Sequence, residues 1–399
     1  MPREFSSRLP WDRPENALAS LEGVRRARGE EILDLTVSNP TQVGLADLGP
    51  LVSEALASSG GGAYEPAPAG LPAARAAVAV ELAAGGAPLS PDRLLLTASS
   101  SESYAFLFKL LCDPGDAALV PEPSYPLFEY LARLEGVTPV PYRLAYDGAW
   151  HVDFASVDAA LTQVRGRARA LIVVNPNNPT GSFLKRSELP ALAARCAAHD
   201  LAVIADEVFA PYAARNDAEQ VRALAAESAF TERVLTFALG GLSKSCGLPQ
   251  LKLGWTAVAG PAAQADQAMA RLTLIADTYL SVGAPVQVAA ARLLAIGREA
   301  RRAIAARIAA NRARLAAALP ASSRCTLLPS EGGWSALVRV PATRSDEAWA
   351  TALLAEEGVL VHPGYFFDLR DGTFLVLSLL PPAAVFAEGT RRLVARCDS

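Results

Sequence analysis

The sequence of 399 residues has few of the residues that build metal centres or disulfide frameworks. It contains only three histidines, His151, His199 and His362, which lie far apart in the chain. We therefore expect no histidine-rich metal site. Its five cysteines are scattered without C-x-x-C spacing, as is typical of reduced thiols in a cytoplasmic protein. The sequence thus predicts a cytoplasmic protein without a metal centre.

Charge and long apolar runs are also scarce. The net charge is −4 and no stretch is rich in Lys and Arg, so we expect neither a nucleic acid nor a membrane as partner. The first residues include Arg3, Glu4 and Arg8 and lack the apolar core of a secretory signal. No apolar run reaches the length of a bilayer-spanning helix. What remains is a globular composition, 51% hydrophobic and 20% charged, in a chain long enough for two domains.

Short apolar runs alternate with helical patterns through the middle of the chain. The runs are residues 94–96, 117–120, 170–174, 201–205 and 234–239, and a polar cluster follows each one. Buried strands separated by helices predict a mostly parallel sheet with helices on both faces. Because ligands bind at the carboxyl edge of such a sheet, we expect the polar clusters to meet in one site.

The pattern changes after Pro261. Residues 261–319 are helical with a break near 281–285, and strand candidates follow at 336–340, 358–362 and 373–380. The sequence therefore predicts an α/β fold of two parts. A large domain spans residues 46–285, and a smaller α+β domain spans residues 286–399. Residues 1–45 form an arm, with a strand at 32–37, that contributes to the small domain.

Lys244 is the most informative residue of the chain. It lies among Gly240, Gly241, Ser243 and Ser245, directly after the last strand of the middle region. A lysine in this setting packs poorly, but it can project its amine into a cleft at the end of a strand. Such an amine can form a Schiff base with an aldehyde cofactor. The alternative is an ordinary surface lysine.

Two further segments lie in a suggestive order before this lysine. Asn178-Pro179-Thr180-Gly181 precedes Asp206 by 28 residues (178 to 206), and Asp206 precedes Lys244 by 38 (206 to 244). In this order and spacing, from about residue 33 to 393, the chain resembles the class I/II aminotransferases of the fold-type I pyridoxal-phosphate enzymes. The resemblance implies transfer of an amino group between an amino acid and a 2-oxo acid through a Schiff base on Lys244. It also implies a homodimer with shared active sites.

The resemblance assigns roles around the cofactor ring. Lys244 would also move the substrate's α-proton, and Asp206 would pair with the pyridine nitrogen. Asn178 would bind the cofactor's phenolic oxygen and the substrate, Tyr125 would stack on the ring, and Ser38 would bind substrate. A solvated strand end, a simple turn and a plain core aromatic remain the alternatives for Asp206, Asn178 and Tyr125.

The cofactor phosphate has its own expected site. Three serines open a helix, and its N-terminal N–H groups suit a phosphate: Ser99, Ser100 and Ser101. Lys252 stands where the family usually carries a phosphate-binding arginine. Tyr64 resembles the tyrosine that reaches the phosphate of the neighbouring subunit. An ordinary serine N-cap and a tyrosine in a surface turn are the alternatives.

Three further positions depart from the family pattern. Gly241 stands where a serine is usual, and Phe209 where a tyrosine is usual, with Tyr212 as a possible substitute for the lost hydroxyl. Val376 stands where most members carry the arginine that binds the substrate's carboxylate. Arg143, Arg339 and Arg370 are candidate replacement cations by sequence proximity only, and a solvated surface arginine is the favoured alternative for each. His362 and Trp334 lie near the expected substrate pocket, or belong to the core.

These departures keep a second reaction class open. The same scaffold supports a pyridoxal-phosphate-dependent lyase, decarboxylase, or enzyme of β- or γ-substitution or carbon–carbon bond formation, because the protein selects which bond of the substrate breaks. A non-catalytic regulator is disfavoured, since the chain shows no basic helix-turn-helix extension.

Overall fold

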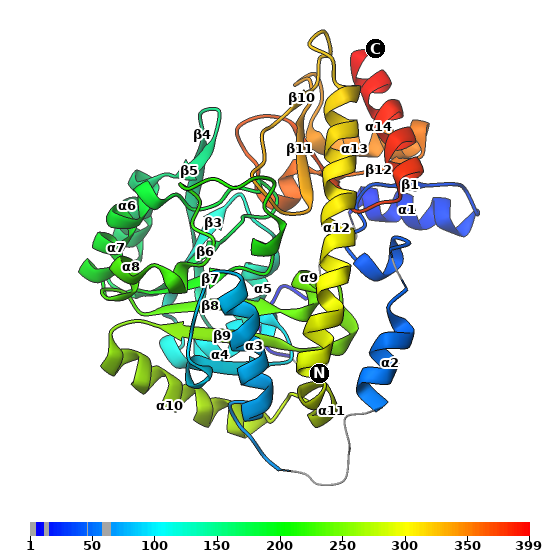
Figure 1. The fold of residues 1–399 in the computed structure, drawn as a ribbon. Helices are drawn as coiled ribbons and strands as arrows, with labels where there is room; N and C mark the ends of the chain where they lie inside the picture. Colours follow the sequence, from blue (N-terminus) through cyan, green and yellow to red (C-terminus); the bar gives the residue numbers. More distant parts are fainter. Residues whose placement is uncertain (1–4, 12–15, 46, 58–64) are drawn as a thin grey trace.

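The computed structural model describes residues 5–11, 16–45, 47–57 and 65–399. Its centre is an eight-stranded sheet in the order β2-β9-β8-β7-β6-β3-β4-β5 (Figure 1). Strands β3, β4, β6, β7 and β8 run parallel, whereas β9 is antiparallel to both its neighbours and β5 forms a hairpin with β4. The strands are β2 (Leu94–Thr97), β3 (Ala117–Glu122), β4 (Thr138–Tyr146), β5 (Trp150–Val152), β6 (Ala168–Val174), β7 (Ala202–Asp206), β8 (Thr236–Gly241) and β9 (Gly254–Ala259).

Helices cover both faces of this sheet, as the sequence predicts. Within β6, Ala170 and Ile172 pack into one core and Leu171 and Val173 into another, because successive side chains of a strand point to opposite faces. The first face carries α4 (Ser100–Leu111), α5 (Leu127–Leu134) and α10 (Ala262–Tyr279). The other carries α6 (Phe154–Val164), α7 (Leu189–Ala198) and α8 (Ser228–Thr231), with α3 (Pro72–Ala84) beside them.

Strand β9 is missing from the sequence prediction. It contains Gly254 and Thr256, which break the apolar pattern, yet it pairs with β8 on one side and with the edge strand β2 on the other. Its glycine allows close packing, because a Cβ there would lie only 3.1 Å from the carbonyl carbon of Ser99. The strand therefore runs directly beneath the turn that opens α4.

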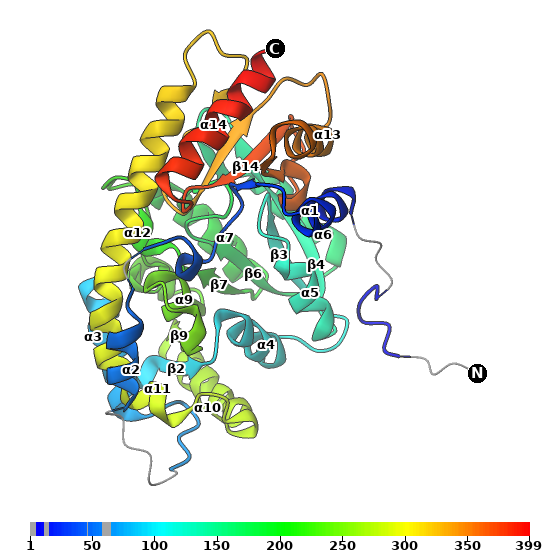
Figure 2. The same cartoon turned by 90° about the vertical axis from the view of Figure 1, so that its right-hand side faces the viewer.

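A second, smaller sheet lies above the first. Its order is β10-β11-β14-β13, all antiparallel. Helix α14 covers it, while α13 lies at its edge and continues into a π-helical turn (Figure 2). The elements are β10 (Thr326–Leu327), β11 (Ser335–Arg339), β13 (His362–Pro363), β14 (Phe374–Ser378), α13 (Asp346–Ala352), the π-helical turn (Leu353–Glu357) and α14 (Ala383–Asp398).

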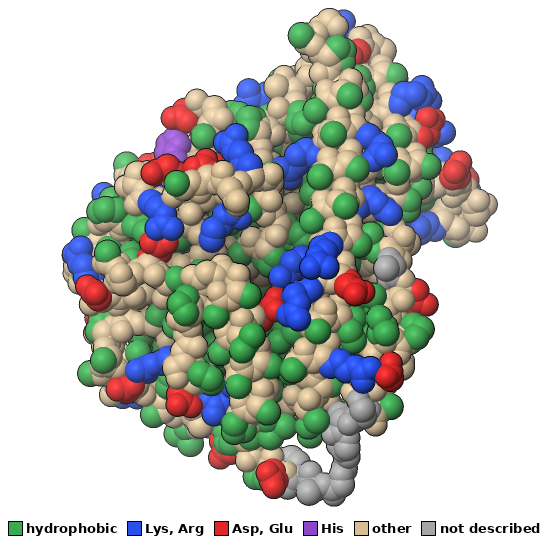
Figure 3. Space-filling model, viewed as in Figure 1, with side chains coloured by type: hydrophobic (Ala, Val, Ile, Leu, Met, Phe, Trp, Pro, Cys, Tyr) green, Lys and Arg blue, Asp and Glu red, His purple; other side chains and the backbone are tan. Residues whose placement is uncertain are grey.

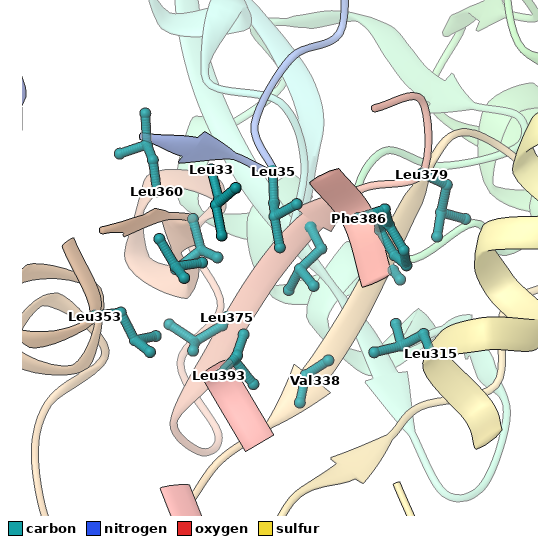
Figure 4. Close-up of a cluster of buried hydrophobic side chains, with 14 of the residues drawn as sticks. Leu33, Leu35, Leu315, Val338, Leu353, Leu360, Leu375, Leu379, Phe386 and Leu393 are labelled. Carbon is teal, nitrogen blue, oxygen red and sulfur yellow. The ribbon is translucent and has the colours of Figure 1, made fainter. Parts of the chain in front are cut away.

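The N-terminal segment is built into the smaller unit. After α1 (Ala17–Ala27), the short strand β1 (Leu33–Asp34) pairs in parallel with β12 (Val359–Leu360). Leu33 and Leu35 are buried with Leu375, Phe386 and Leu393 (Figure 4). The strand is shorter than the sequence suggests. Leu35 N still donates to Leu360 O of β12, but the Leu35 carbonyl accepts from Ser378 N, and Thr36 N donates to Asp34 Oδ1.

Helix α12 (Ala290–Ala318) joins the two units, and it follows the short helix α11 (Ala284–Val288). Leu293 near its start packs into the core under the large sheet, whereas Ile304 and Leu315 pack into the core of the small unit. Figures 1 and 2 show it running along the length of the molecule. No helix in the described residues is long and apolar enough to cross a bilayer.

Ion pairs fix α12 to the large sheet's outer layer. Arg298 and Arg301 both reach Glu81 on α3, at 3.0 Å and 2.6 Å. Arg301 also donates to the carbonyl of Ser245, at 2.9 Å. Basic side chains lie along this helix on the face shown in Figure 3. The ion pairs thus hold α12 against α3, and the Arg301 hydrogen bond holds it against the short helix that carries Lys244.

Candidate active site

One cavity of about 400 Å³ lies at the carboxyl edge of the central strands, between the two sheets. Every predicted site residue that the structure describes lines it: Ser38, Ser99, Ser100, Ser101, Tyr125, Asn178, Asp206, Lys244 and Lys252. Tyr64 lies outside the described residues. The volume of this cavity is in the range of small-molecule sites. The polar clusters that follow separate strands in the sequence thus meet in one place.

Lys244 lies in α9 (Leu242–Ser245), a single turn directly after β8. The hydroxyl of Tyr212 donates to the Lys244 carbonyl oxygen at 2.7 Å, which anchors this turn through its backbone. The side-chain nitrogen lies 5.3 Å from the ring centre of Trp334 and 5.8 Å from that of Phe209. Burial lowers the pKa of the amine, and Asp206 opposes this shift. The buried environment therefore makes the amine easier to deprotonate than an exposed lysine.

Asp206 is the last residue of β7, and only two long hydrogen bonds stabilise its buried carboxylate. Tyr104 donates its hydroxyl to Oδ2 at 3.2 Å, and Val208 donates its N–H to Oδ1 at 3.3 Å. In the described part of the chain no cation forms an ion pair with it. Burial raises the pKa of Asp206 to about 6, although these two donors and Lys244 act against the shift. Such a carboxyl suits a ligand that brings a protonated nitrogen.

Tyr104 is a site residue that the sequence analysis does not find. It lies four residues after Ser100 on α4, so both side chains lie on the same face of the helix. That face meets the end of β7, and Tyr104 also lines the cavity. The helical spacing from the serine cluster is the signal that points to it.

One end of the cavity is suited to an anion. Ser99 caps α4 by accepting the N–H of Glu102 at 3.2 Å. The N–H groups of Ser100 and Ser101 belong to the first helical turn, where no carbonyl four residues earlier accepts them. Lys252 lines the same cavity, two residues before the glycine of β9 that lies beneath Ser99. A helix N-terminus with an adjacent cation is an arrangement that binds phosphate.

The turn after β6 contains three asparagines, of which two bind backbone atoms and one lines the cavity. Asn175 and Asn177 are buried and bind backbone: their amides donate to the carbonyls of Val221 at 2.7 Å and Pro123 at 3.1 Å. Asn178 faces the cavity instead, and its Oδ1 accepts the hydroxyl of Ser335 at 3.0 Å. Its Nδ2 remains available to donate to a ligand in the cavity.

The structure explains one family departure and corrects a suggestion about another. At Gly241 a Cβ would lie 3.1 Å from both Leu253 O and Gly254 Cα, so a serine there would crowd the backbone of the neighbouring strand. Tyr212 does not replace the hydroxyl missing at Phe209, because it is buried and its hydroxyl is bound to the Lys244 carbonyl. Phe209 packs edge-on against Trp334, with ring centres 5.2 Å apart.

The three candidate arginines do not reach this cavity. Arg143, Arg339 and Arg370 line a separate cavity of about 100 Å³. Arg143 pairs there with Asp371, and Arg370 pairs with Glu122 at 3.0 Å. No arginine among the described residues lines the Lys244 cavity. The suggestion that one of these three faces the substrate is therefore wrong.

Fold and cavity together define a fold-type I pyridoxal-phosphate enzyme. Comparison with known proteins identifies the chain as a member of the class I and II aminotransferase family, whose model matches residues 30–384. Members of this family use pyridoxal 5′-phosphate. The predicted fold class, family and cofactor are thereby confirmed.

Two relatives show how far the likeness reaches. The arginine–pyruvate transaminase AruH of Pseudomonas aeruginosa is 30% identical over 388 residues, which cover 96% of this chain and 93% of the relative. The alanine aminotransferase of Mycobacterium tuberculosis is 30% identical over 265 residues. That match covers 65% of this chain and 59% of the relative, so the chain spans less than two thirds of its length.

Solved structures have the same fold. An alanine aminotransferase from Pyrococcus furiosus superposes with a TM-score of 0.83 at 24% identity and covers 99% of both chains. An N-succinyldiaminopimelate aminotransferase from Mycobacterium tuberculosis gives 0.80 at 26% identity, over 98% of this chain and 100% of that one.

The described residues fit pyridoxal phosphate. The α4 N-terminus and Lys252 suit its phosphate, and the amine of Lys244 suits its aldehyde. The weakly supported carboxyl of Asp206 suits a protonated ring nitrogen. These features line one cavity of adequate size.

Proposed function

We propose that this protein is an aminotransferase that moves an amino group between an amino acid and a 2-oxo acid. The observation that carries the proposal is the meeting of Lys244, Asp206 and the α4 N-terminus in one cavity. When bound, pyridoxal phosphate supplies an aldehyde and an electron-withdrawing ring that stabilises negative charge at the substrate's α-carbon. The residues of the chain determine which bond of the substrate breaks and where the proton goes.

Lys244 would hold the cofactor covalently. Once freed, its amine would take the proton from the substrate's α-carbon and deliver it to the carbon of the cofactor's aldehyde group. The lowered pKa of its amine supports this role. Asp206 would keep a proton on the ring nitrogen, and the amide of Asn178 would donate to the cofactor's phenolic oxygen. Tyr125 would cover the ring and Ser38 would bind the substrate; both residues line the cavity.

The test is an amino-donor screen with pyruvate as acceptor, because named relatives act on alanine or on pyruvate. We expect the donor's 2-oxo acid and alanine to form in equal amounts. Release of ammonia or carbon dioxide without amino exchange would instead identify a lyase or decarboxylase. Absence of product from every donor, in protein that has bound the cofactor, would contradict both activities.

Lys252 should set the affinity for the cofactor. We expect Lys252→Ala to weaken pyridoxal-phosphate binding by about tenfold to a hundredfold, the usual effect of losing a charge-assisted hydrogen bond. Lys252→Arg should retain most of the affinity. Equilibrium dialysis of the cofactor measures it, with Lys109→Ala as control, since Lys109 pairs with Glu135 at the far end of α4. An unchanged dissociation constant for Lys252→Ala would show that the lysine does not meet the phosphate.

We also propose a cytoplasmic homodimer. Exposed apolar side chains support a dimer face: Leu51 on α2 (Gly49–Ala57), Tyr279 and Leu280 at the end of α10, and Val288 on α11. Helices α2 and α11 lie side by side in Figures 1 and 2. Sedimentation equilibrium should give twice the mass of one chain, and a monomer at micromolar concentration would contradict the proposal.

We further propose the domain division given by the sequence, with residues 46–285 as the cofactor-binding domain. The small domain comprises residues 286–399 and the arm, residues 1–45. The separate hydrophobic cores support this division, although the start of α12 packs with the large domain.

A further inference from the structure

His362 lies beside Val376 on the wall that the small sheet contributes to the cavity. Strands β13 and β14 are antiparallel, and His362 is directly opposite Val376 in their register. Side chains of opposite residues lie on the same face of a sheet, about 5 Å apart. Both residues line the Lys244 cavity. The imidazole therefore faces the same space as Val376.

The imidazole has no polar partner within the described chain. No hydrogen bond or ion pair to His362 occurs among the described residues, and its neighbours are the rings of Phe366 and Phe367, at 5.7 Å and 5.9 Å between centres. Its nitrogens are not among the fully buried unpartnered atoms. A histidine that only fills a core usually has its ring nitrogens hydrogen-bonded. Here the ring nitrogens have no polar partner among the described residues, and the side chain lines the cavity.

Positive charge is otherwise confined to the cofactor end of the cavity. The lining cations are Lys244 and Lys252, which the proposed function commits to the aldehyde and to the phosphate. On the small-sheet wall, the hydroxyls of Ser335 and Ser378 already donate to Asn178 Oδ1 at 3.0 Å and to Val37 O at 2.6 Å. Among the described lining residues, His362 is the one group on this wall that can become positively charged.

We infer that His362, in its protonated form, binds the carboxylate of the substrate. The inference rests on the proposed aminotransferase function and deepens it, because it names the residue that recognises the carboxylate of both amino acid and 2-oxo acid. An imidazolium donates N–H groups to a carboxylate in a charge-assisted bond. Without such a partner, a carboxylate in this part of the cavity would lack a counter-charge.

The charges around His362 make this binding depend on pH. Burial lowers its pKa, while Asp34 on β1 and Glu22 on α1 raise it. Arg26 offsets both carboxylates, at 2.7 Å from Glu22 and 3.2 Å from Asp34.

The remaining charged groups near His362 bind other partners or lie across the cavity. On α13, Asp346 and Glu347 accept hydrogen bonds from the backbone and hydroxyl of Tyr365. Across the cavity lie Asp206, Lys244 and Lys252.

The net effect of these surroundings is a lowered pKa of His362, so the free imidazole is mostly neutral at pH 7. A bound carboxylate raises that pKa, and binding therefore takes up a proton. Affinity should fall as pH rises from the free pKa to the pKa of the complex.

The direct test is imidazole NMR of the holoenzyme, which has only three histidines. The His362 signal is assigned by its loss in His362→Gln, and the probes are 3-phenylpropionate and propionate, with 3-phenyl-1-propanol and 1-propanol as uncharged partners. We expect the acids to raise the pKa of His362 by about one unit or more, and the alcohols to leave it unchanged. A His362 pKa that does not respond to either acid overturns the inference.

Kinetics provide an independent test. For the best amino acid donor of the screen, we expect His362→Gln to raise KM by about tenfold or more while kcat changes little. The amine formed by removing the donor's carboxylate should be insensitive to the substitution. His199→Gln, at the end of α7, is the matched control. Equal losses for amino acid and amine would indicate a structural role and contradict the inference.

The two tests separate this inference from the proposed function. If the wild-type enzyme transaminates but His362 neither shifts its pKa with the acids nor alters KM, the inference fails and the aminotransferase proposal stands. If no donor reacts with the wild type, the aminotransferase proposal fails, and the inference that depends on it fails as well.

Discussion

Lys244→Ala is expected to reduce turnover by at least about a thousandfold, because one amine both holds the cofactor and moves the substrate's proton. The fold should survive, since α9 is anchored by backbone atoms: Leu242 N donates to Leu253 O, and Tyr212 donates to the Lys244 carbonyl. The variant should still bind pyridoxal phosphate noncovalently through the α4 N-terminus. Single-turnover kinetics with the best donor, together with dialysis of the cofactor, measure both effects.

A matched control is Lys109→Ala, which removes a lysine from the same domain far from the cavity and should retain wild-type turnover. Circular dichroism of both variants establishes that the fold is intact. Turnover of Lys244→Ala within about tenfold of wild type would show that another group carries the proton, since such a transfer alone is usually worth at least about a hundredfold.

Asp206→Asn should have two opposite effects. Turnover should fall by more than about a hundredfold, because a neutral amide cannot stabilise a protonated ring nitrogen as a preorganised carboxylate does. The cofactor-free variant should be more stable than the cofactor-free wild type at about pH 8, by roughly 1–3 kcal/mol. A residue kept for chemistry at the expense of stability would show both effects.

The sign of the stability effect follows from the pKa of Asp206. Folding raises it from 3.8 to about 6, so the folded state favours the protonated carboxyl. Wild-type stability therefore falls as pH rises through this window, whereas the asparagine variant does not lose it. Urea unfolding at pH 8 and pH 4 measures the difference, which should shrink at the lower pH. An equal difference at both values would contradict a titrating carboxyl, and normal turnover would contradict its role.

The sequence predicts the arrangement of this site better than its details. Strand ends carry Asn178, Asp206 and Lys244 to one edge because parallel strands share a direction, and apolar runs reveal those strands. The sequence pattern does not reveal strand β9, because Gly254 and Thr256 interrupt its apolar run. Arg143, Arg339 and Arg370 illustrate a second limit.

Those arginines lie near site residues in the sequence, yet Asp371 and Glu122, the last residue of β3, hold two of them away from the Lys244 cavity. Which side chain faces a cavity depends on strand register, and the sequence does not give the register of β13 against β14. His362 therefore emerges as a candidate only once its partner across the strands is known.

The most direct test of the whole account is borohydride reduction of the holoenzyme, followed by peptide mapping. We predict a pyridoxyl group on the side-chain nitrogen of Lys244 and on no other lysine. Protein saturated with cofactor that yields no adduct, or an adduct on Lys252 in place of Lys244, would contradict the assignment on which every role proposed for this cavity depends.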